Sequence, residues 1–199
     1  MPNLSSTCRR ILSQGLSQLR CSQSPPKDLL PWLENRHSLT QQLQQYCSDR
    51  IRVVVLSEEN GFPDADERRL LQLPSRSGAY IRQIRLMCGS LPVVYARTVV
   101  PHSSLTGKER RLRHIGTGSL GAVLFAHRRM QPGLRELRCV LAGSRLYRVA
   151  VAGISQESSL IWGRRSIFYL DCKPLLVSEY FLPKFVASIS AQEQSQSYE

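Results

Sequence analysis

The sequence predicts one α+β domain in which helices pack on an antiparallel sheet of about six strands. The chain has 199 residues, of which 42% are hydrophobic, and this is enough to bury one core. Segments rich in β-branched and aromatic residues recur along the chain, and several are joined by connections of only a few residues. Short connections imply antiparallel neighbours, because a parallel crossover needs about a dozen residues or more. The expected strands are 51–57, 80–88, 92–100, 145–154, 162–170 and 175–182.

Helices are expected where capping signals precede apolar stripes. Residues 27–34 follow Pro25-Pro26 and predict a short helical turn. Ser38 with Gln41, and Thr106 with Glu109, have the spacing of capping boxes. A further short helix is expected over 64–71, after a Gly-Pro-containing break that ends the first strand. After Ser38, one helical face carries Leu39, Leu43, Tyr46 and Cys47.

Both ends of the chain differ from the middle in composition. We expect residues 1–26 to form a basic extension, residues 27–185 a catalytic domain, and residues 186–199 a polar tail, disordered from Ser188 onward. The first 27 residues contain no acid, as in a transit peptide, but no cleavage pattern follows them. A short helix or a loose basic extension is the interpretation we prefer.

The formal charge of +12 raises the question of a nucleic acid or an anionic membrane as partner. The arginines lie in pairs spread over the whole chain, with no aromatic-interleaved stripe and no DNA-binding motif. We therefore expect no nucleic-acid partner. A basic surface protein stays as an alternative, which salt-sensitive binding to DNA or anionic vesicles would reveal.

The cysteines and histidines show no metal-ligand spacing, so no metal site and no cofactor are expected. The cysteines are scattered, which is typical of reduced structural thiols in a cytoplasmic protein. The longest apolar runs are far shorter than the roughly 20 residues of a membrane helix. The cysteines are Cys8, Cys21, Cys47, Cys88, Cys139 and Cys172, and the histidines are His37, His102, His114 and His127.

Residues 116–121 match the pattern G-x-G-x-x-G of dinucleotide-binding loops. In that fold the glycines follow an apolar strand, and an acidic residue lies about 20 positions later. Here the preceding segment is charged and helix-like, and no acid occupies the later position. The glycines are better explained by a close backbone approach than by a nucleotide site.

Strand alternation places two charges among apolar side chains. Arg82 shares its face with Ile84 and Leu86, and Glu179 shares its face with Val177 and Phe181. Buried charges are costly unless they are paired. A buried Arg82–Glu179 salt bridge, or an edge of the sheet where both reach water, would satisfy them. A ligand cavity that needs one cation and one carboxylate is the functional alternative.

Five motifs, in the same order, resemble the chorismate lyases of ubiquinone-producing bacteria. The similarity covers residues 80–125 and 162–183 well, and 27–47 weakly. Residues 126–161 look longer than in that family, and Leu39 stands where the family often has methionine. The motifs are Arg97-Thr98-Val99-Val100-Pro101, Leu105-Thr106-Gly107, Ser119-Leu120-Gly121, Trp162-Gly163-Arg164-Arg165-Ser166 and Lys173-Pro174-Leu175-Leu176 followed by Glu179.

The resemblance implies helical flaps over an internal cavity and a cofactor-free lyase that converts chorismate into 4-hydroxybenzoate and pyruvate, the first step of the ubiquinone pathway. It implies ligand contacts at Arg82, Leu120 and Glu179, with Leu39 as a less certain fourth. Arg82 would bind a substrate carboxylate with backbone amides near Leu120 and Leu39, and Glu179 would bind the 4-hydroxyl and assist loss of the ring proton. A concerted rearrangement and a base-assisted elimination both stay open.

The resemblance also implies partners and a rival function. We expect a cytoplasmic monomer, and a transient contact with the membrane or with a downstream prenyltransferase stays open. The same fold resembles the effector-binding domains of bacterial transcription regulators, so a non-enzymatic sensor of small aromatic acids is the alternative. Those regulators carry a winged-helix domain, for which we expect no room before the first strand of this chain.

Overall fold

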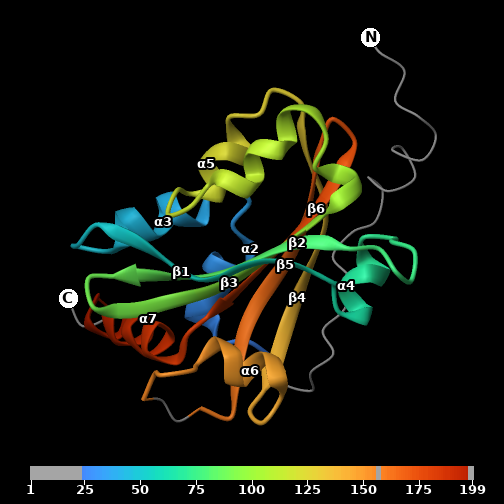
Figure 1. The fold of residues 1–199 in the computed structure, drawn as a ribbon. Helices are drawn as coiled ribbons and strands as arrows, with labels where there is room; N and C mark the ends of the chain where they lie inside the picture. Colours follow the sequence, from blue (N-terminus) through green and yellow to red (C-terminus); the bar gives the residue numbers. More distant parts are fainter. Residues whose placement is uncertain (1–23, 156–157, 197–199) are drawn as a thin grey trace.

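The computed structural model describes residues 24–155 and 158–196. Within those residues, six strands form a single antiparallel sheet in the order β1-β2-β3-β6-β5-β4, which confirms the predicted α+β fold (Figure 1). Two three-stranded meanders meet where β3 pairs with β6. The strands are β1 (Ile51–Gly61), β2 (Ala79–Cys88), β3 (Leu91–Pro101), β4 (Met130–Leu141), β5 (Leu160–Leu170) and β6 (Lys173–Phe181).

The helices cover both faces of this sheet. In Figure 1, α3 and α5 lie together on one side of it, and α6 lies at the opposite end of the sheet from α5. The 3-10 helices are η1 (Lys27–Leu29), η2 (His102–Ser104) and η3 (Gly107–His114). The α-helices are α2 (Leu30–Glu34), α3 (Leu39–Tyr46), α4 (Ala65–Leu70), α5 (Leu120–Phe125), α6 (Arg145–Ala150) and α7 (Pro183–Gln196).

The predicted strand over 145–154 is wrong, because this segment begins as helix α6. Ser144 caps the helix, and its hydroxyl accepts a hydrogen bond from the Tyr147 amide at 3.2 Å. Tyr147 and Ala150, three residues apart, are both buried, which is a helical spacing. The valines in this segment favour a strand by propensity, but the cap and the tertiary packing decide for a helix.

Strand β4 was not predicted. It carries Pro132 and Gly133 together with several charged residues, a composition that argues against an interior strand. The structure resolves the conflict, because β4 is an edge strand and its pairing with β5 is irregular between Pro132 and Arg135. Proline is tolerated at such edges and bulges.

Three boundaries also differ from the prediction. Strand β1 continues through Asn60 and Gly61 instead of ending before them. Thr106 makes no side-chain cap, so the second predicted capping box is absent, and the segment it opens is the 3-10 helix η3. The tail expected to be disordered from Ser188 belongs to α7 as far as Gln196, because Phe185 and Ile189 are buried against the core. Residues 1–23 of the predicted extension lie outside the described residues.

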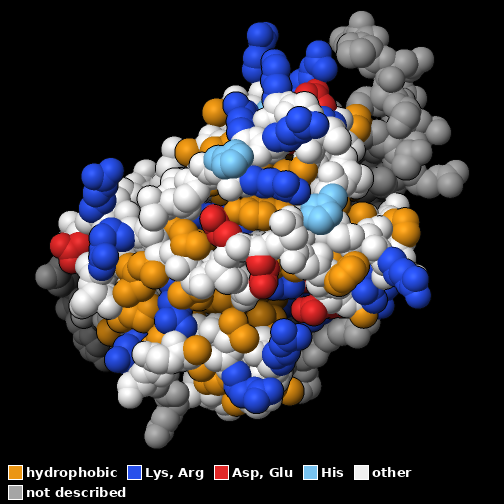
Figure 2. Space-filling view, in the orientation of Figure 1, with side chains coloured by type: hydrophobic (Ala, Val, Ile, Leu, Met, Phe, Trp, Pro, Cys, Tyr) orange, Lys and Arg blue, Asp and Glu red, His pale blue; other side chains and the backbone are white. Residues whose placement is uncertain are grey.

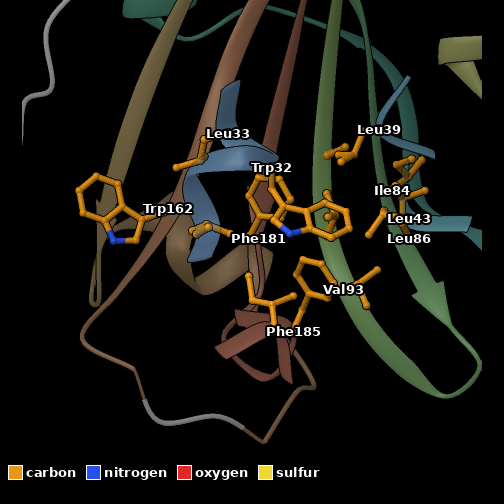
Figure 3. Packing of buried hydrophobic residues seen from close by; sticks show 14 residues of the cluster. Trp32, Leu33, Leu39, Leu43, Ile84, Leu86, Val93, Trp162, Phe181 and Phe185 are labelled. Atoms are coloured by element: carbon orange, nitrogen blue, oxygen red, sulfur yellow. The ribbon is translucent and has the colours of Figure 1, made fainter. Parts of the chain in front are cut away.

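An aromatic cluster anchors α2 and α7 to the lower half of the sheet. Figure 3 shows Trp32 packed against Phe181 and Phe185. The Trp32 and Phe185 rings meet edge to face, with centroids 5.0 Å apart and planes at 86°, a preferred geometry for aromatic pairs. The same core cluster includes Leu39 and Ile84, so the apolar core continues up to the space beneath α3 and α5.

Candidate active site

A cavity lies between one face of the sheet and the N-terminal ends of α3 and α5. Arg82 from β2, Glu179 from β6, Leu39 from α3 and Leu120 from α5 all line it. These are the four residues expected from the sequence, and the structure brings them together. The volume of the cavity, counted as the space that the centre of a water molecule can occupy, is about 60 Å³.

Strand register explains why the two charges face the same space. Arg82 lies opposite Thr98 of β3, and Thr98 lies opposite Val177 of β6. Glu179 is two residues beyond Val177 and therefore points to the same face. Arg85 points to the other face, where its Nη2 donates to the carbonyls of Ala150 at 3.2 Å and Ala152 at 2.5 Å. The predicted phase of both strands is therefore correct.

Arg82 does not pair with Glu179. The side chain of Arg82 is 2% exposed, and its Nε donates to Glu58 Oε1 of β1 at 2.9 Å. Its Nη2 donates to the carbonyls of Gly116 at 2.5 Å and Gly118 at 3.4 Å. Both salt-bridge and edge interpretations of Arg82 are therefore wrong. The glycine-rich segment follows the 3-10 helix η3 and presents carbonyls to a cation, which excludes the geometry of a dinucleotide loop.

Two helix N-termini meet at the roof of the cavity. Ser38 caps α3 and Ser119 caps α5, so Leu39 and Leu120 are the first residues of their helices. Amides in a first helical turn have no acceptor within the helix and can donate to a ligand. Ser119 Oγ donates to Thr40 Oγ1 at 3.3 Å, and a Cβ at Gly121 would lie 3.0 Å from Ser38 Oγ. The glycine therefore allows the two helix ends to approach closely.

Glu179 pairs with Arg164 of β5, a residue that the sequence indicated only through a motif. Arg164 Nε donates to Glu179 Oε2 at 2.6 Å. Arg164 is 2% exposed, and its Nη1 donates to the carbonyls of Trp32 at 2.8 Å and Asn35 at 2.6 Å. Strand alternation could have indicated its position, because consecutive residues such as Arg164 and Arg165 face opposite sides of β5.

Arg135 is a further guanidinium at the cavity that sequence reasoning missed. It extends from β4, where its Nε donates to Ser166 Oγ at 3.1 Å. Burial and the nearby charge of Arg164 lower the pKa of Arg135 to about 10, which still leaves it protonated at pH 7. The sequence analysis missed Arg135 because it did not predict β4, whose composition argues against a strand.

A separate ionic cluster lies beside the flap that carries α5. Glu109 of η3, His127 and Asp171 place one potential ligand atom each within 4.8 Å of the others, although the sequence predicted no metal site. Lys173 Nζ donates to Glu109 Oε2 at 2.5 Å, and Arg129 Nη1 donates to Asp171 Oδ1 at 3.1 Å. Both carboxylates are therefore neutralised by cations, and the cluster joins the flap to the β5–β6 turn. Tertiary contact, not spacing in the sequence, brings these residues together.

In Figure 2, several Lys and Arg side chains lie close together at the top of the molecule, and others are spread around the rest of this face. Among the described residues, none of the helices is both long and apolar enough to cross a membrane.

The fold and the cavity define a protein in which an arginine-lined cavity lies between an antiparallel sheet and two helix ends. The family model described as chorismate lyase matches residues 13–190. The chain therefore belongs to the chorismate lyase family. It is 39% identical over 152 residues to a probable chorismate pyruvate-lyase of Methylococcus capsulatus, covering 76% of this chain and 93% of the relative. It is 40% identical over 153 residues to that of Methylobacillus flagellatus, covering 77% and 85%.

Solved structures share the fold at low sequence identity. Gene product SA0254 of Staphylococcus aureus has a TM-score of 0.54 at 12% identity, covering 75% of this chain and 90% of that one. The effector domain of PhnF from Mycobacterium smegmatis has a TM-score of 0.50 at 13% identity, covering 76% and 92%. These likenesses concern the fold alone.

Proposed function

We propose that this chain is a chorismate lyase, which converts chorismate into 4-hydroxybenzoate and pyruvate. One observation carries the proposal: Arg82, Glu179, Leu39 and Leu120 line a single cavity, and the two leucines are the first residues of their helices. Chorismate is a dianion, so a buried guanidinium beside free backbone donors is suited to one of its carboxylates.

In the reaction, the ether bond between the ring and the enolpyruvyl group breaks and the ring loses a proton as it becomes aromatic. Aromatisation is strongly downhill, so the protein mainly has to hold a reactive geometry, which can lower a barrier by about 7 to 11 kcal/mol in favourable cases. Arg82 binds the ring carboxylate through its Nη1, for which the described residues offer no acceptor. The amides of Leu120 and Leu39 donate to the same carboxylate.

Glu179 binds the 4-hydroxyl that the product retains. Its pairing with Arg164 orients the carboxylate. In one route the ring proton passes within the substrate to the enolpyruvyl methylene group. In the other, Glu179 accepts the ring proton as the ether bond breaks, and the departing enolate of pyruvate takes up a proton at its methylene carbon.

The direct test is to mix the purified chain with chorismate and to measure both products. We expect 4-hydroxybenzoate by chromatography and pyruvate by a lactate dehydrogenase assay, in equal amounts. Saturable binding of chorismate or 4-hydroxybenzoate with no turnover would overturn the proposal and favour the non-enzymatic sensor of the same fold.

Turnover is expected to need no metal or organic cofactor. Exhaustive chelation followed by assay should leave the rate unchanged. A large loss that one particular metal restores would contradict this expectation, and it would direct attention to Glu109, His127 and Asp171.

We further propose that the chain acts as a cytoplasmic monomer, through its domain over residues 27–185, and supplies 4-hydroxybenzoate to the ubiquinone pathway. The family supports this placement, because 4-hydroxybenzoate is the aromatic ring that a prenyltransferase can extend. Deleting the gene should lower ubiquinone, and added 4-hydroxybenzoate should restore it. Failure of that rescue would contradict the pathway assignment.

A further inference from the structure

Arg135 differs from the other two arginines of the cavity in its partners. Arg82 pairs with Glu58, and Arg164 pairs with Glu179. Among the described residues, no carboxylate lies within ion-pair distance of Arg135. Its Nε donates to a serine hydroxyl, and its Nη1 donates to the carbonyls of Glu34 at 3.1 Å and Asn35 at 2.6 Å. Arg135 is partly buried, and Glu179, which acts on it through space, is already paired with Arg164. A partly buried cation without an ion-pair partner of its own favours the binding of an anion.

Arg135 and Arg164 also converge on one acceptor. The carbonyl of Asn35 accepts from Nη1 of both residues, at 2.6 Å in each case. Two guanidiniums held this close repel each other, which agrees with the lowered pKa of Arg135. The Nη2 group of each has no acceptor among the described residues, and both residues line the cavity. Two free donors and an unbalanced positive charge are the features of an anion site.

The sheet places this pair at the far side of the cavity from Arg82. Arg82 aligns in register with Thr98, Val177 and Ser166, and Ser166 lies opposite Arg135. Four strand steps separate Arg82 from Arg135, about 19 Å at the backbone. Both long side chains extend into the shared cavity and narrow this gap. The cavity therefore has a cation at each end and Glu179 between them.

We propose that Arg135, together with Nη2 of Arg164, binds the carboxylate of the enolpyruvyl side chain, while Arg82 holds the ring carboxylate. This inference rests on the proposed function and assigns the second charge of its substrate. The enolpyruvyl group is attached next to the carbon whose hydroxyl Glu179 binds, and Glu179 touches Arg164. Arg135 thus selects the dianion over monoanions such as 4-hydroxybenzoate, and it releases its ligand when pyruvate leaves.

The test compares Arg135→Met and Arg135→Gln with Arg138→Met. Arg138 is on the same strand but on the opposite face, where it pairs with Asp66. We expect both Arg135 variants to raise KM for chorismate at least about tenfold, as for a lost charge-assisted contact. Inhibition by 4-hydroxybenzoate should change less than about threefold, and inhibition by pyruvate should weaken. Arg138→Met should leave all three values within about twofold.

Arg135→Gln controls for a folding defect, because the side-chain amide of glutamine can still donate to the carbonyls of Glu34 and Asn35. An unchanged KM, or equal losses for chorismate and 4-hydroxybenzoate, would overturn the assignment of Arg135. A wild-type chain without turnover would instead overturn the proposed function. In that case the affinity of uncleaved chorismate, measured by calorimetry for the wild type and both variants, still tests the Arg135 site.

Discussion

At the scale of single residues, the arginines that line the cavity have different partners. Arg82 is held by Glu58 and by two glycine carbonyls, so it is oriented before any ligand arrives. Such preorganisation reduces what binding must spend on ordering side chains. Cys47 differs from these arginines because its side chain stays uncharged. Burial and a hydrogen bond with Cys88 raise the pKa of its thiol to about 12.

Replacing Arg82 by alanine should weaken binding of both chorismate and 4-hydroxybenzoate. The change removes the cation from the ring carboxylate, and removing one partner of a buried ion pair costs about 3 to 5 kcal/mol. It also removes the partner of Glu58, which is less affected because its side chain is 28% exposed. Calorimetry with 4-hydroxybenzoate and steady-state kinetics with chorismate measure the two losses. Arg85→Ala is the control, because Arg85 faces away from the cavity and holds the end of α6. Equal effects of the two changes on ligand affinity would contradict the assignment of Arg82.

Substitutions at Glu179 should separate its two proposed roles. Glu179→Ala is expected to lower kcat/KM for chorismate, and an unchanged value in a folded protein would make Glu179 structural. Glu179→Gln keeps the shape and a hydrogen bond but accepts no proton. A base role predicts a fall in kcat of about 10² or more with product affinity largely kept, whereas an orienting role predicts a modest loss.

At the scale of elements, the roof depends on the close approach of α3 and α5. Only a residue without Cβ fits at Gly121 unless Ser38 shifts. The flap that carries α5 is also fixed at its other end, where the cluster of Glu109, His127 and Asp171 lies. The first turn of α5, which lines the cavity, is therefore placed by contacts on both sides of the flap.

Gly121→Ala should reduce activity without a matching loss of stability. Alanine favours a helix over glycine by up to about 1 kcal/mol, which offsets the tight contact with Ser38. A displacement of a few tenths of an ångström at the roof should lower kcat/KM by up to about tenfold, since a 1 Å misplacement can cost about 10²-fold. Gly61→Ala, whose Cβ would make an ordinary 3.4 Å contact with Ile81, is the control. Unchanged kinetics in Gly121→Ala would show that the roof spacing is not critical.

At the scale of the whole molecule, the sheet separates two ionic systems. The face that α3 and α5 cover, here called the front face, carries the cavity. The opposite face is called the back face. On the back face, α4 supplies Glu67 to Arg97, with Nε and Oε1 2.8 Å apart, and Asp66 to Arg165, with Nη1 and Oδ2 2.5 Å apart. The arginines of this second network all have ion-pair partners, so the network fixes α4 to the sheet. Of its buried nitrogen atoms, only Nε of Arg138 lacks an acceptor among the described residues.

Acid should weaken the back-face network when it protonates Asp66. Burial raises the pKa of Asp66, but the charges of Arg165 and Arg138 and a hydrogen bond from Arg165 outweigh it and lower the pKa below 3.8. A carboxyl group with a lowered pKa stabilises the fold above its unfolded value, and this contribution disappears as the pH falls through the folded value. The Tm of the wild type should therefore exceed that of Asp66→Asn at neutral pH, and the gap should close below pH 3.8. An equal gap at both pH values would contradict the ion pair.

The sequence by itself determined the face of each strand residue. Side chains alternate along a strand because of local backbone geometry, so Arg82 and Glu179 could be placed on one apolar face without knowing any partner. Local capping likewise predicted α3, where the Gln41 amide donates to Ser38. Local patterns failed where tertiary contacts outweigh propensity, as in α6 and in the edge strand β4.

The tertiary structure alone decided which charges meet. Glu58 rather than Glu179 faces Arg82, because β1 is the strand that pairs with β2. Arg135 reaches the cavity only because β4 pairs with β5, and residues 31 positions apart then form the Arg135–Ser166 contact. Strand order depends on contacts between distant segments, whose energies no short window of sequence contains. The local sequence pattern therefore determined which face of the sheet each site residue occupies. The assembly of the sheet determined which ion pairs form and left Arg135 without an ion-pair partner among the described residues.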